Sequence, residues 1–498
     1  MTTDTAHHRA GRSTASGLVR LSTGFIVVAL LALMIADIHL YRPDPWQELG
    51  RIGLGLVTPT WPDIPELALA VGHTVAFALL AVAVSAGLGL LLAMWFHWRW
   101  VRVLAAAIRS VHEVFWGLLF MQVWGLSATT GLLAILIPFT GIFAKVFADI
   151  LQQQRPHTVQ TFGAASRINR YAYGWIPKAW PELLSYVRYR FECALRSSAI
   201  LGFIGLPTLG FHLETAFRQG QYSEAAAVLW VFLLLIASVR LWLRPRLVPL
   251  FIVAAIWILP EMPPVNASFF WQFISQDLWP KALQRGDIIA TGQWYAKVFM
   301  SDVWPALWQT LAVTQIALVV SGVLALLYYP FASRWLVGSV RPLGRFKLLV
   351  LRSVPELMLA YVFMLIFGPS ALPAILALGI HNGGLIAFLL ANNSEDSSHT
   401  QRPDSPTGAM RFFYQDLPQR YPAFLALLFY RWEVIMRESA MMGVLGIATL
   451  GFYVDSAFEE IRFDKAFFLI VMAAILNIVI DSLSRRLRKR AGLRTPLM

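Results

Sequence analysis

The sequence YRFECALRSSAILGFIGLPTLGFHLETAF at residues 189–217 recurs as YRWEVIMRESAMMGVLGIATLGFYVDSAF at residues 430–458. The two stretches align without a gap at an offset of 241 residues (430 minus 189), and 14 of their 29 positions are identical. A constant offset over such a length indicates an internal duplication. We therefore expect this segment to have the same structural and functional role in each half of the chain.

The composition favours a membrane protein. Of the 498 residues, 57% are hydrophobic and 14% are charged, and the mean hydropathy is +0.60, whereas an ordinary soluble domain has roughly 25% charged residues. The net charge of +13 fits the basic cytoplasmic loops of membrane proteins, so we expect no nucleic-acid partner. The single cysteine, Cys193, excludes an intrachain disulfide, and its match with Val434 indicates a small apolar filler.

Apolar runs long enough to cross a bilayer core of about 20 residues occur six times in each half. In the first half they lie near 21–40, 68–96, 104–125, 129–150, 190–206 and 223–242. In the second half they lie near 247–260, 304–329, 347–367, 371–391, 430–447 and 464–484. Since a backbone in lipid must satisfy its own hydrogen bonds, the sequence predicts an all-α polytopic membrane protein with about twelve transmembrane helices.

Basic residues gather in alternate loops, in the N-terminal segment and in the tail RRLRKR at 485–490. By the positive-inside rule, both termini are expected in the cytoplasm, as an even number of crossings requires. We expect a multi-pass protein of the bacterial inner membrane. Its predicted parts are a tail at 1–20, a first unit at 21–246, a second unit at 247–490 and a tail at 491–498.

The duplication extends beyond the opening segment. The run GHTVAFALLAVAVSAGLGLLLA at 72–93 resembles WQTLAVTQIALVVSGVLALL at 308–327, which aligns Thr74 with Thr310. RSVHEVFWGLLF at 109–120 resembles RSVPELMLAYVF at 352–363. Six crossings per unit give both units the same orientation, so they form a parallel repeat about an axis along the membrane normal.

Together these motifs resemble the permease subunits of binding-protein-dependent ABC importers of the type I fold, and most of all the phosphonate-type permeases. The resemblance covers about 70–490 in two copies, so it implies two permease units fused in one chain. It implies two copies of a cytoplasmic ATPase subunit and a periplasmic solute-binding protein as partners. The implied substrate is a phosphonate or a related phosphorus oxyanion such as phosphate or phosphite; another small anionic solute is the alternative. The first copy departs from the pattern at Arg240, which stands at the position of Asp481.

In such importers a cytoplasmic loop carries a short helix, after a Glu-Ala-Ala-x-x-x-Gly pattern, that docks on the ATPase. The loops at 157–181 and 406–418 match it in part, although His-Thr-Val replaces Glu-Ala-Ala in the first, and a purely solvated loop is the alternative. The resemblance assigns coupling to Gly163, Ala164, Ala165, Pro177, Gly408, Ala409 and Pro418.

The repeated segment itself carries charges and glycines at fixed spacing. Glu192 precedes Arg196 by four residues, and Glu433 precedes Arg437 likewise, which is the favourable order for an ion pair on one helix face. We expect structural clasps there, with direct substrate contact as the alternative. The glycines indicate close packing or a bend before a short periplasmic helix, along the interface between the halves; they are Gly202, Gly205, Gly210, Gly443, Gly446 and Gly451.

The R-S-V-x-E element places a base four residues before an acid inside an apolar run. Structural pairing and lining of the translocation pathway are both open for these residues, because carboxylates inside a membrane usually face a bundle interior or a cavity. His112 stands where the second copy has Pro355. The candidates for pathway lining are Thr74, Arg109, Glu113, Thr310, Arg352 and Glu356.

Other chemistries have no motif. The chain lacks G-x-x-x-x-G-K-[ST], H-E-x-x-H and a cysteine–histidine cluster, so we expect no enzyme activity, cofactor or metal, and ATP hydrolysis by a separate subunit. A membrane enzyme would need polar residues clustered at one depth, and a secondary transporter would need no repeated coupling loop. The permease interpretation is therefore preferred over both.

Overall fold

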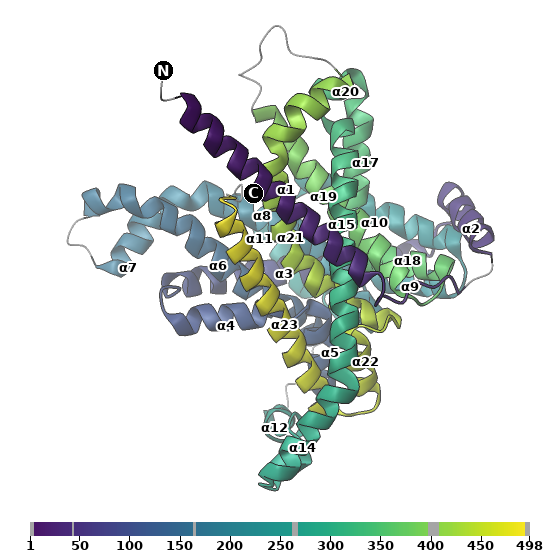
Figure 1. Ribbon diagram of the computed structural model, residues 1–498. Coiled ribbons are helices and arrows are strands. Elements are labelled where there is room, and N and C mark those ends of the chain that lie inside the picture. The colour runs from purple at the N-terminus through teal and green to yellow at the C-terminus, as the bar shows by residue number, and fades with distance from the viewer. Residues whose placement is uncertain (1–3, 42–43, 163–165, 261–266, 397–407, 494–498) are drawn as a thin grey trace. The chain divides into compact units, whose positions relative to one another are not determined.

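The structure, a computed structural model, describes residues 4–41, 44–162, 166–260, 267–396 and 408–493. The protein is 86% helical, and the described residues contain no strand. The all-α polytopic class predicted from the sequence is confirmed (Figure 1).

The helices follow one another in two similar series. The first runs α1 (Asp4–Ala32), α2 (Pro45–Val57), α3 (Ile64–Met94), α4 (Arg99–Ser110), α5 (Glu113–Trp124), α6 (Ala128–Phe162), α7 (Arg167–Asn169), η1 (Arg170–Trp175), α8 (Ile176–Ile200), η2 (Leu201–Ile204), α9 (Leu209–Arg218) and α10 (Tyr222–Trp242). The second begins with α11 (Val248–Ile258), α12 (Ala267–Gln272), η3 (Phe273–Asp277), α13 (Lys281–Gln284), α14 (Ile288–Val298), η4 (Phe299–Val303), α15 (Trp304–Ala332), α16 (Arg334–Val337) and η5 (Gly338–Val340). It ends with α17 (Arg341–Ser353), α18 (Glu356–Phe367), α19 (Ala371–Asp396), α20 (Gly408–Arg411), η7 (Phe412–Asp416), α21 (Leu417–Met441), η8 (Met442–Leu445), α22 (Leu450–Glu459) and α23 (Phe463–Arg490).

Six helical stretches among the described residues are long and apolar enough to cross a membrane. They are Ile64–Met94, Ala128–Gln153, Tyr222–Trp242, Ile288–Ala332, Ala371–Asn392 and Phe463–Arg490. Four bent helix pairs raise the number of candidate spans to ten if each pair is one span. The two other predicted spans correspond to shorter apolar helices, Gly17–Ala32 and Val248–Ile258, so six to ten candidate spans stand against the twelve expected.

The bends occur at matched places in the two series. The α4–α5 pair bends by 88° and the α17–α18 pair by 89°. The segment from Arg170 to Arg218 bends by 47°, and the matched segment from Gly408 to Glu459 bends by 42°. The internal duplication is therefore visible in the backbone as well as in the sequence.

The chain divides into two compact units that are not the two sequence halves. Leu49–Trp279 forms the first-repeat unit, and Met1–Glu48 together with Pro280–Met498 forms the second-repeat unit. This division differs from the expected boundary between residues 246 and 247, because the first helix of each series packs in the unit of the other.

The contacts of α1 and α11 explain why each of these helices belongs to the unit of the other series. In Figure 1, α1 runs alongside α15 of the second-repeat unit. The side-chain amide of Gln315 donates to the backbone oxygen of Phe25 at 3.1 Å. The ring of Phe25 meets the rings of Phe429 and Trp432 edge-on, at centroid distances of 5.0 and 4.9 Å. In the first-repeat unit, α11 packs on α3, where Ile258 lies against Gly72. α1 thus packs against α15 in the second-repeat unit, and α11 packs against α3 in the first-repeat unit.

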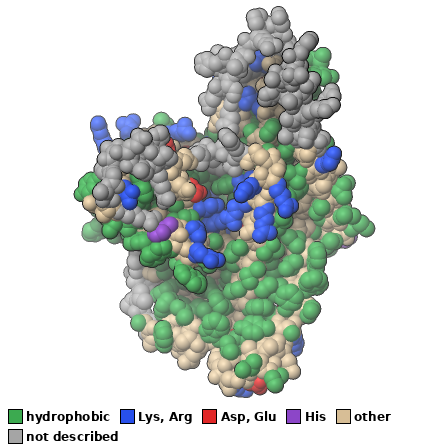
Figure 2. Space-filling model, turned by 60° about the vertical axis from the view of Figure 1, so that its left-hand side comes forward, with side chains coloured by type: hydrophobic (Ala, Val, Ile, Leu, Met, Phe, Trp, Pro, Cys, Tyr) green, Lys and Arg blue, Asp and Glu red, His purple; other side chains and the backbone are tan. Residues whose placement is uncertain are grey.

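The surface fits a lipid environment. Figure 2 shows broad areas of hydrophobic side chains, with Lys and Arg gathered at their margin. Large apolar side chains on candidate spans are strongly exposed, among them Leu91, Leu234 and Leu327. Exposure of such residues over long helices is expected where lipid, not water, is the solvent.

Candidate functional site

The repeated segment folds into a long helix, a tight turn and a short helix in both units. These are α8–η2–α9 and α21–η8–α22. A Cβ added to Gly202 would collide with the backbone nitrogen of Phe211, and one added to Gly443 would collide with that of Phe452. The turn and the short helix therefore touch backbone to backbone, which only glycine permits.

The other glycines of the segment also act locally. Gly205 and Gly446 end the turns with φ of 94° and 83°, in the left-handed region. A Cβ on Gly210 would collide with the backbone oxygen of Ala199. Gly451 lies buried in the first turn of α22. Bend and close packing are thus both present within each unit.

Thr74 and Thr310 tie the short helices to the first long helix of each unit. The Thr74 hydroxyl accepts a hydrogen bond of 3.0 Å from the backbone nitrogen of Leu209, and the Thr310 hydroxyl accepts one of 3.0 Å from that of Leu450. Both side chains are fully buried. Since the first backbone N–H groups of a helix have no partner within it, these hydroxyls have a structural role in the described contacts.

The R-S-V-x-E element is the place of the sharp bend. Arg109 lies in the last turn of α4 and Glu113 begins α5, while Arg352 and Glu356 stand likewise at α17 and α18. In each unit the helix ends between the base and the acid, so the two residues lie on different helices. Pro355 explains the break in the second copy, since a proline disfavours helical backbone in the residue before it.

A histidine approaches the glutamate at each bend. His112 Nε2 lies 3.3 Å from Glu113 Oε2, and His381 Nε2 lies 3.8 Å from Glu356 Oε2. All four side chains are buried. No local sequence signal pairs His381 with Glu356, because His381 lies on a separate helix, α19.

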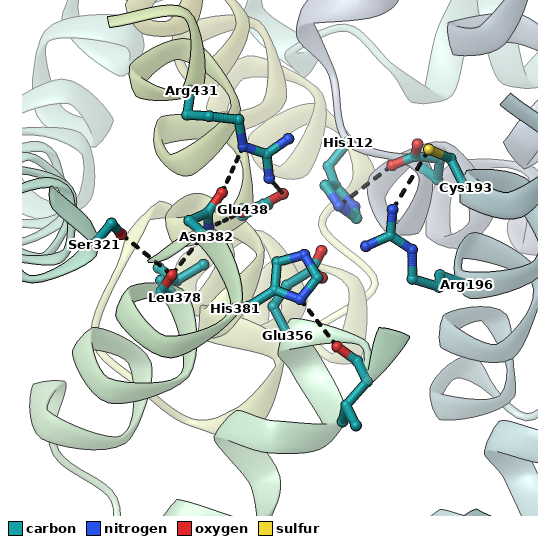
Figure 3. A network of polar contacts seen from close by, with 12 residues as sticks. His112, Cys193, Arg196, Ser321, Glu356, Leu378, His381, Asn382, Arg431 and Glu438 are labelled. Carbon is teal, nitrogen blue, oxygen red and sulfur yellow. Dashed lines mark hydrogen bonds and ion pairs between the residues drawn. The ribbon is translucent and has the colours of Figure 1, made fainter. Parts of the chain in front are cut away.

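The second-repeat unit holds a buried polar network that sequence reasoning missed (Figure 3). Arg431 Nε donates to Asn382 Oδ1 at 2.6 Å, and its Nη2 lies 3.4 Å from Glu438 Oε1. Asn382 Nδ2 donates to Glu438 Oε2 at 3.0 Å and to the backbone oxygen of Leu378 at 3.0 Å. A buried charge is retained at acceptable cost only when paired and hydrogen-bonded in this way.

The first-repeat unit is built differently at the matched positions. Arg190 matches Arg431 at the offset of 241, and Glu438 matches Ser197. The Arg190 guanidinium lies 4.4 Å from the ring centroid of Phe139 on α6. The same arginine position thus meets an amide and a carboxylate in one unit and an aromatic ring in the other.

The predicted clasp residues share one helix in each unit, as their spacing requires. Glu192 and Arg196 lie on α8, and Glu433 and Arg437 lie on α21. Arg196 Nη2 also approaches Cys193 Sγ at 3.4 Å. The ion pairing of each clasp stays a prediction.

The candidate coupling loops are described in part. Gly163, Ala164 and Ala165 lie outside the described residues. Gly408 and Ala409 begin α20 and are exposed. The two loops match at their ends, where each has a proline, Pro177 or Pro418. These prolines lie in the first turns of α8 and α21, directly after the π-helical turns η1 and η7.

Each π-helical turn presents an aromatic side chain to the surface. Tyr173 is 74% exposed and Tyr414 is 77% exposed, and the two match at the offset of 241 (414 minus 173). The two π-helical turns thus share an exposed tyrosine at matched positions.

Among the described residues, no group of three or more histidine, cysteine, aspartate or glutamate side chains could hold a metal ion.

Comparison with known proteins gives relatives of one kind. No protein-family model and no solved structure matches the chain. The phosphate-import permease protein PhnE of Mycolicibacterium smegmatis is 25% identical in an alignment of 427 positions that covers 78% of this chain and 77% of the relative. Because these shares are nearly equal, the two proteins are similar in length.

Shorter relatives match parts of the chain at higher identity. The putative cryptic phosphonate transport system permease protein PhnE2 of Escherichia coli K12 is 31% identical over 118 residues, 23% of this chain and 96% of the relative. The phosphite transport system permease protein PtxC of Stutzerimonas stutzeri is 31% identical over 140 residues, 28% of this chain and 51% of the relative. Together with the duplicated helical fold, these matches show that the chain belongs to the family of phosphonate-type transport-system permease proteins.

Proposed function

We propose that this chain is the permease subunit of an ATP-driven ABC importer and forms the translocation pathway for a phosphorus oxyanion. The observation that carries the proposal is the duplicated segment at 189–217 and 430–458, in a chain whose relatives are named for phosphate, phosphite and phosphonate transport. Permeases of such systems are transport subunits and not enzymes. ATP hydrolysis is assigned to a separate subunit, in keeping with the lack of a phosphate-cradling loop.

Each copy of the repeat acts as one permease unit in this proposal. The relative of similar length matches most of the chain, whereas the Escherichia coli relative is matched almost entirely by 23% of it. One chain would then do the work of two separate permease subunits. It would bind two ATPase subunits and one solute-binding protein.

The ATPase is expected to bind where η1 leads into α8 and where η7 leads into α21. Support comes from the matched prolines, Pro177 and Pro418, and from the exposed matched tyrosines, Tyr173 and Tyr414. The basic loops support a cytoplasmic position for this side and for both termini. The solute-binding protein would then bind on the opposite side of the inner membrane.

The charged residues at the bends are the proposed lining of the pathway. Arg109, Glu113, Arg352 and Glu356 lie at matched helix ends within apolar segments, and ionisable residues in such segments usually face a bundle interior or a cavity. The hydroxyls of Thr74 and Thr310 already accept hydrogen bonds from backbone nitrogens, so they are weaker candidates for contact with the solute.

Uptake by cells that express the chain with its ATPase and solute-binding protein tests the proposal. Labelled inorganic phosphate should enter in an ATP-dependent manner. An excess of at least one of phosphite and methylphosphonate should compete with it, whereas an excess of sulfate should not. Uptake that persists without the ATPase, or competition by sulfate alone, would contradict the proposed function.

A further inference from the structure

Two membrane-embedded bends each hold an imidazole beside a carboxylate, but the two histidines come from different places. His112 directly precedes Glu113 between α4 and α5. His381 comes from the middle of α19 and meets Glu356 at the start of α18. The same pair of groups is therefore assembled twice by different routes.

The matched positions explain the two routes. At the offset of 243 that relates Glu113 to Glu356, His112 matches Pro355 and His381 matches Pro138. Histidine and proline have exchanged places between the copies. The offset is supported by packing, since Gly141 lies against Ile108 and the residues 243 positions later, 384 and 351, lie against each other.

The contacts of His112 fix its proton. Its Nδ1 accepts a hydrogen bond of 3.2 Å from the backbone nitrogen of Val114, so this atom carries no proton. In the neutral imidazole the proton then stands on Nε2, which donates to Glu113 at 3.3 Å. The pair is complete without a further proton.

The contacts of His381 lead to the opposite result. Its Nδ1 lies 3.0 Å from the backbone oxygen of Val354, which can only accept, so Nδ1 carries the proton. In a neutral imidazole Nε2 would then present a lone pair to Glu356 Oε2 at 3.8 Å. A further proton between these two atoms replaces repulsion by attraction, either as an imidazolium–carboxylate pair or as a carboxyl group facing Nε2.

A neighbouring carboxylate favours that proton. On α21, Glu438 interacts unfavourably with Glu356, while Arg431 and Arg437 act on Glu438. On α17, Arg352 lies 4.0 Å from the ring centroid of Phe388. The packed elements α15 and η8 contribute no charged residue. The second carboxylate near Glu356 makes an unprotonated pair costly in a medium of low dielectric.

We propose that His381 and Glu356 form a proton-binding site inside the membrane, and that the first-repeat unit has no such site because His112 is fixed as a neutral donor. The consequence for transport rests on the function proposed above. When the pair loses its proton as the pH rises, one net negative charge appears among residues of the anion pathway. Uptake of an anion is then expected to fall with rising pH.

The proton itself can be observed on the purified full-length chain. An infrared difference spectrum between about pH 6 and pH 8, where an imidazole titrates, should contain a component from the pair. This component should disappear in Glu356→Gln and in His381→Gln. It should persist in the matched controls Glu113→Gln and His112→Gln. A spectrum unchanged in Glu356→Gln, in protein that elutes as the parent does, would overturn the proposal.

Exchanging the matched residues gives a second test. The double variant Pro355→His/His381→Pro carries the first-half arrangement in the second half, and it should lose the titrating component. The converse variant His112→Pro/Pro138→His should gain a second one. Equal spectra in the two double variants would contradict the assignment, because only the position of the histidine differs.

Uptake of inorganic phosphate provides the functional arm. The ratio of uptake at the lower pH to that at the higher should fall about fivefold in Glu356→Gln relative to the parent, since one charge no longer appears. Titration of phosphate itself is common to all variants, and Glu113→Gln controls for a general effect of losing a carboxylate. An equal ratio in the parent and in Glu356→Gln would overturn the link to transport. If the parent takes up no phosphate, the proposed substrate fails while the infrared result still decides the proton site.

Discussion

Arg431 donates a hydrogen bond of 2.6 Å from Nε to Oδ1 of Asn382 in the second-repeat unit. At the matched positions of the first-repeat unit, the guanidinium of Arg190 lies 4.4 Å from the ring centroid of Phe139. One arginine position is thus stabilised by polar partners in one unit and by an aromatic face in the other. At this position the two copies share the same helices and the same arginine, but the arginine has different partners.

This relationship predicts the effect of Asn382→Phe, which introduces the first-half residue alone. The change removes hydrogen bonds to both Arg431 and Glu438 and leaves these buried charges poorly satisfied. We expect a loss of about 3 kcal/mol in stability. Thermal unfolding of the purified chain in detergent measures it.

The double variant Asn382→Phe/Glu438→Ser completes the first-half arrangement and should recover much of that loss. Its counterpart in the first-repeat unit is Phe139→Asn, which should destabilise because it removes the aromatic ring next to the Arg190 guanidinium and leaves a cavity. A double variant no more stable than Asn382→Phe would show that the two arginine environments are not interchangeable.

Replacing Thr310 tests the tie between α15 and α22. Thr310→Val keeps the shape but removes the acceptor for the backbone nitrogen of Leu450, and a buried unsatisfied donor costs about 1–3 kcal/mol. Thr310→Ser retains the hydroxyl and should be milder. Melting temperatures of the two variants decide the matter, and equal values would mean that the hydrogen bond contributes nothing.

The two glycines of the turn before α22 should respond unequally to alanine. In Gly443→Ala the new Cβ collides with the backbone of Phe452, so α22 must move and we expect a loss of more than about 3 kcal/mol. Gly446 has nothing within 4 Å and needs only its positive φ of 83°, which costs an alanine about 1–2 kcal/mol. Yields of folded protein from the two variants check the order, and the reverse order would refute the backbone contact.

A charged side chain at Gly408 should abolish ATP-driven uptake without unfolding the chain. Gly408 is exposed, has φ of 61°, and a Cβ added to it has no described atom within 4 Å, so Gly408→Glu creates no clash at its Cβ. Gly286→Glu is a matched control, because Gly286 is equally open with φ of 74° but lies in a loop assigned to the other side of the membrane. Normal uptake in Gly408→Glu at normal protein levels would show that this loop does not contact the ATPase.

Much of the architecture could be predicted because it depends on the local amino-acid composition. The apolar runs gave the helices, and the glycines at Gly202 and Gly205 indicated the bend that the structure places there. The break between Arg109 and Glu113 could not be predicted, because the run at 104–125 is apolar on both sides of the R-S-V-x-E element and Val111 carries no breaking signal. A bend of 88° within such a run follows from packing.

The exchanged first helices and the buried network depend on contacts between residues far apart in sequence. No local signal tells whether Phe25 packs in the unit of α3 or against Phe429. Asn382 and Arg431 are 49 residues apart on two helices. No local sequence signal pairs them, and only the fold shows that they meet.

The central claim is that one chain supplies both permease units of an ATP-driven importer. The most direct measurement is the subunit ratio, by native mass spectrometry, of the complex purified with its ATPase. We predict one copy of this chain with two ATPase subunits. Two copies of the chain for each pair of ATPase subunits, or a chain that purifies with no ATPase, would contradict it.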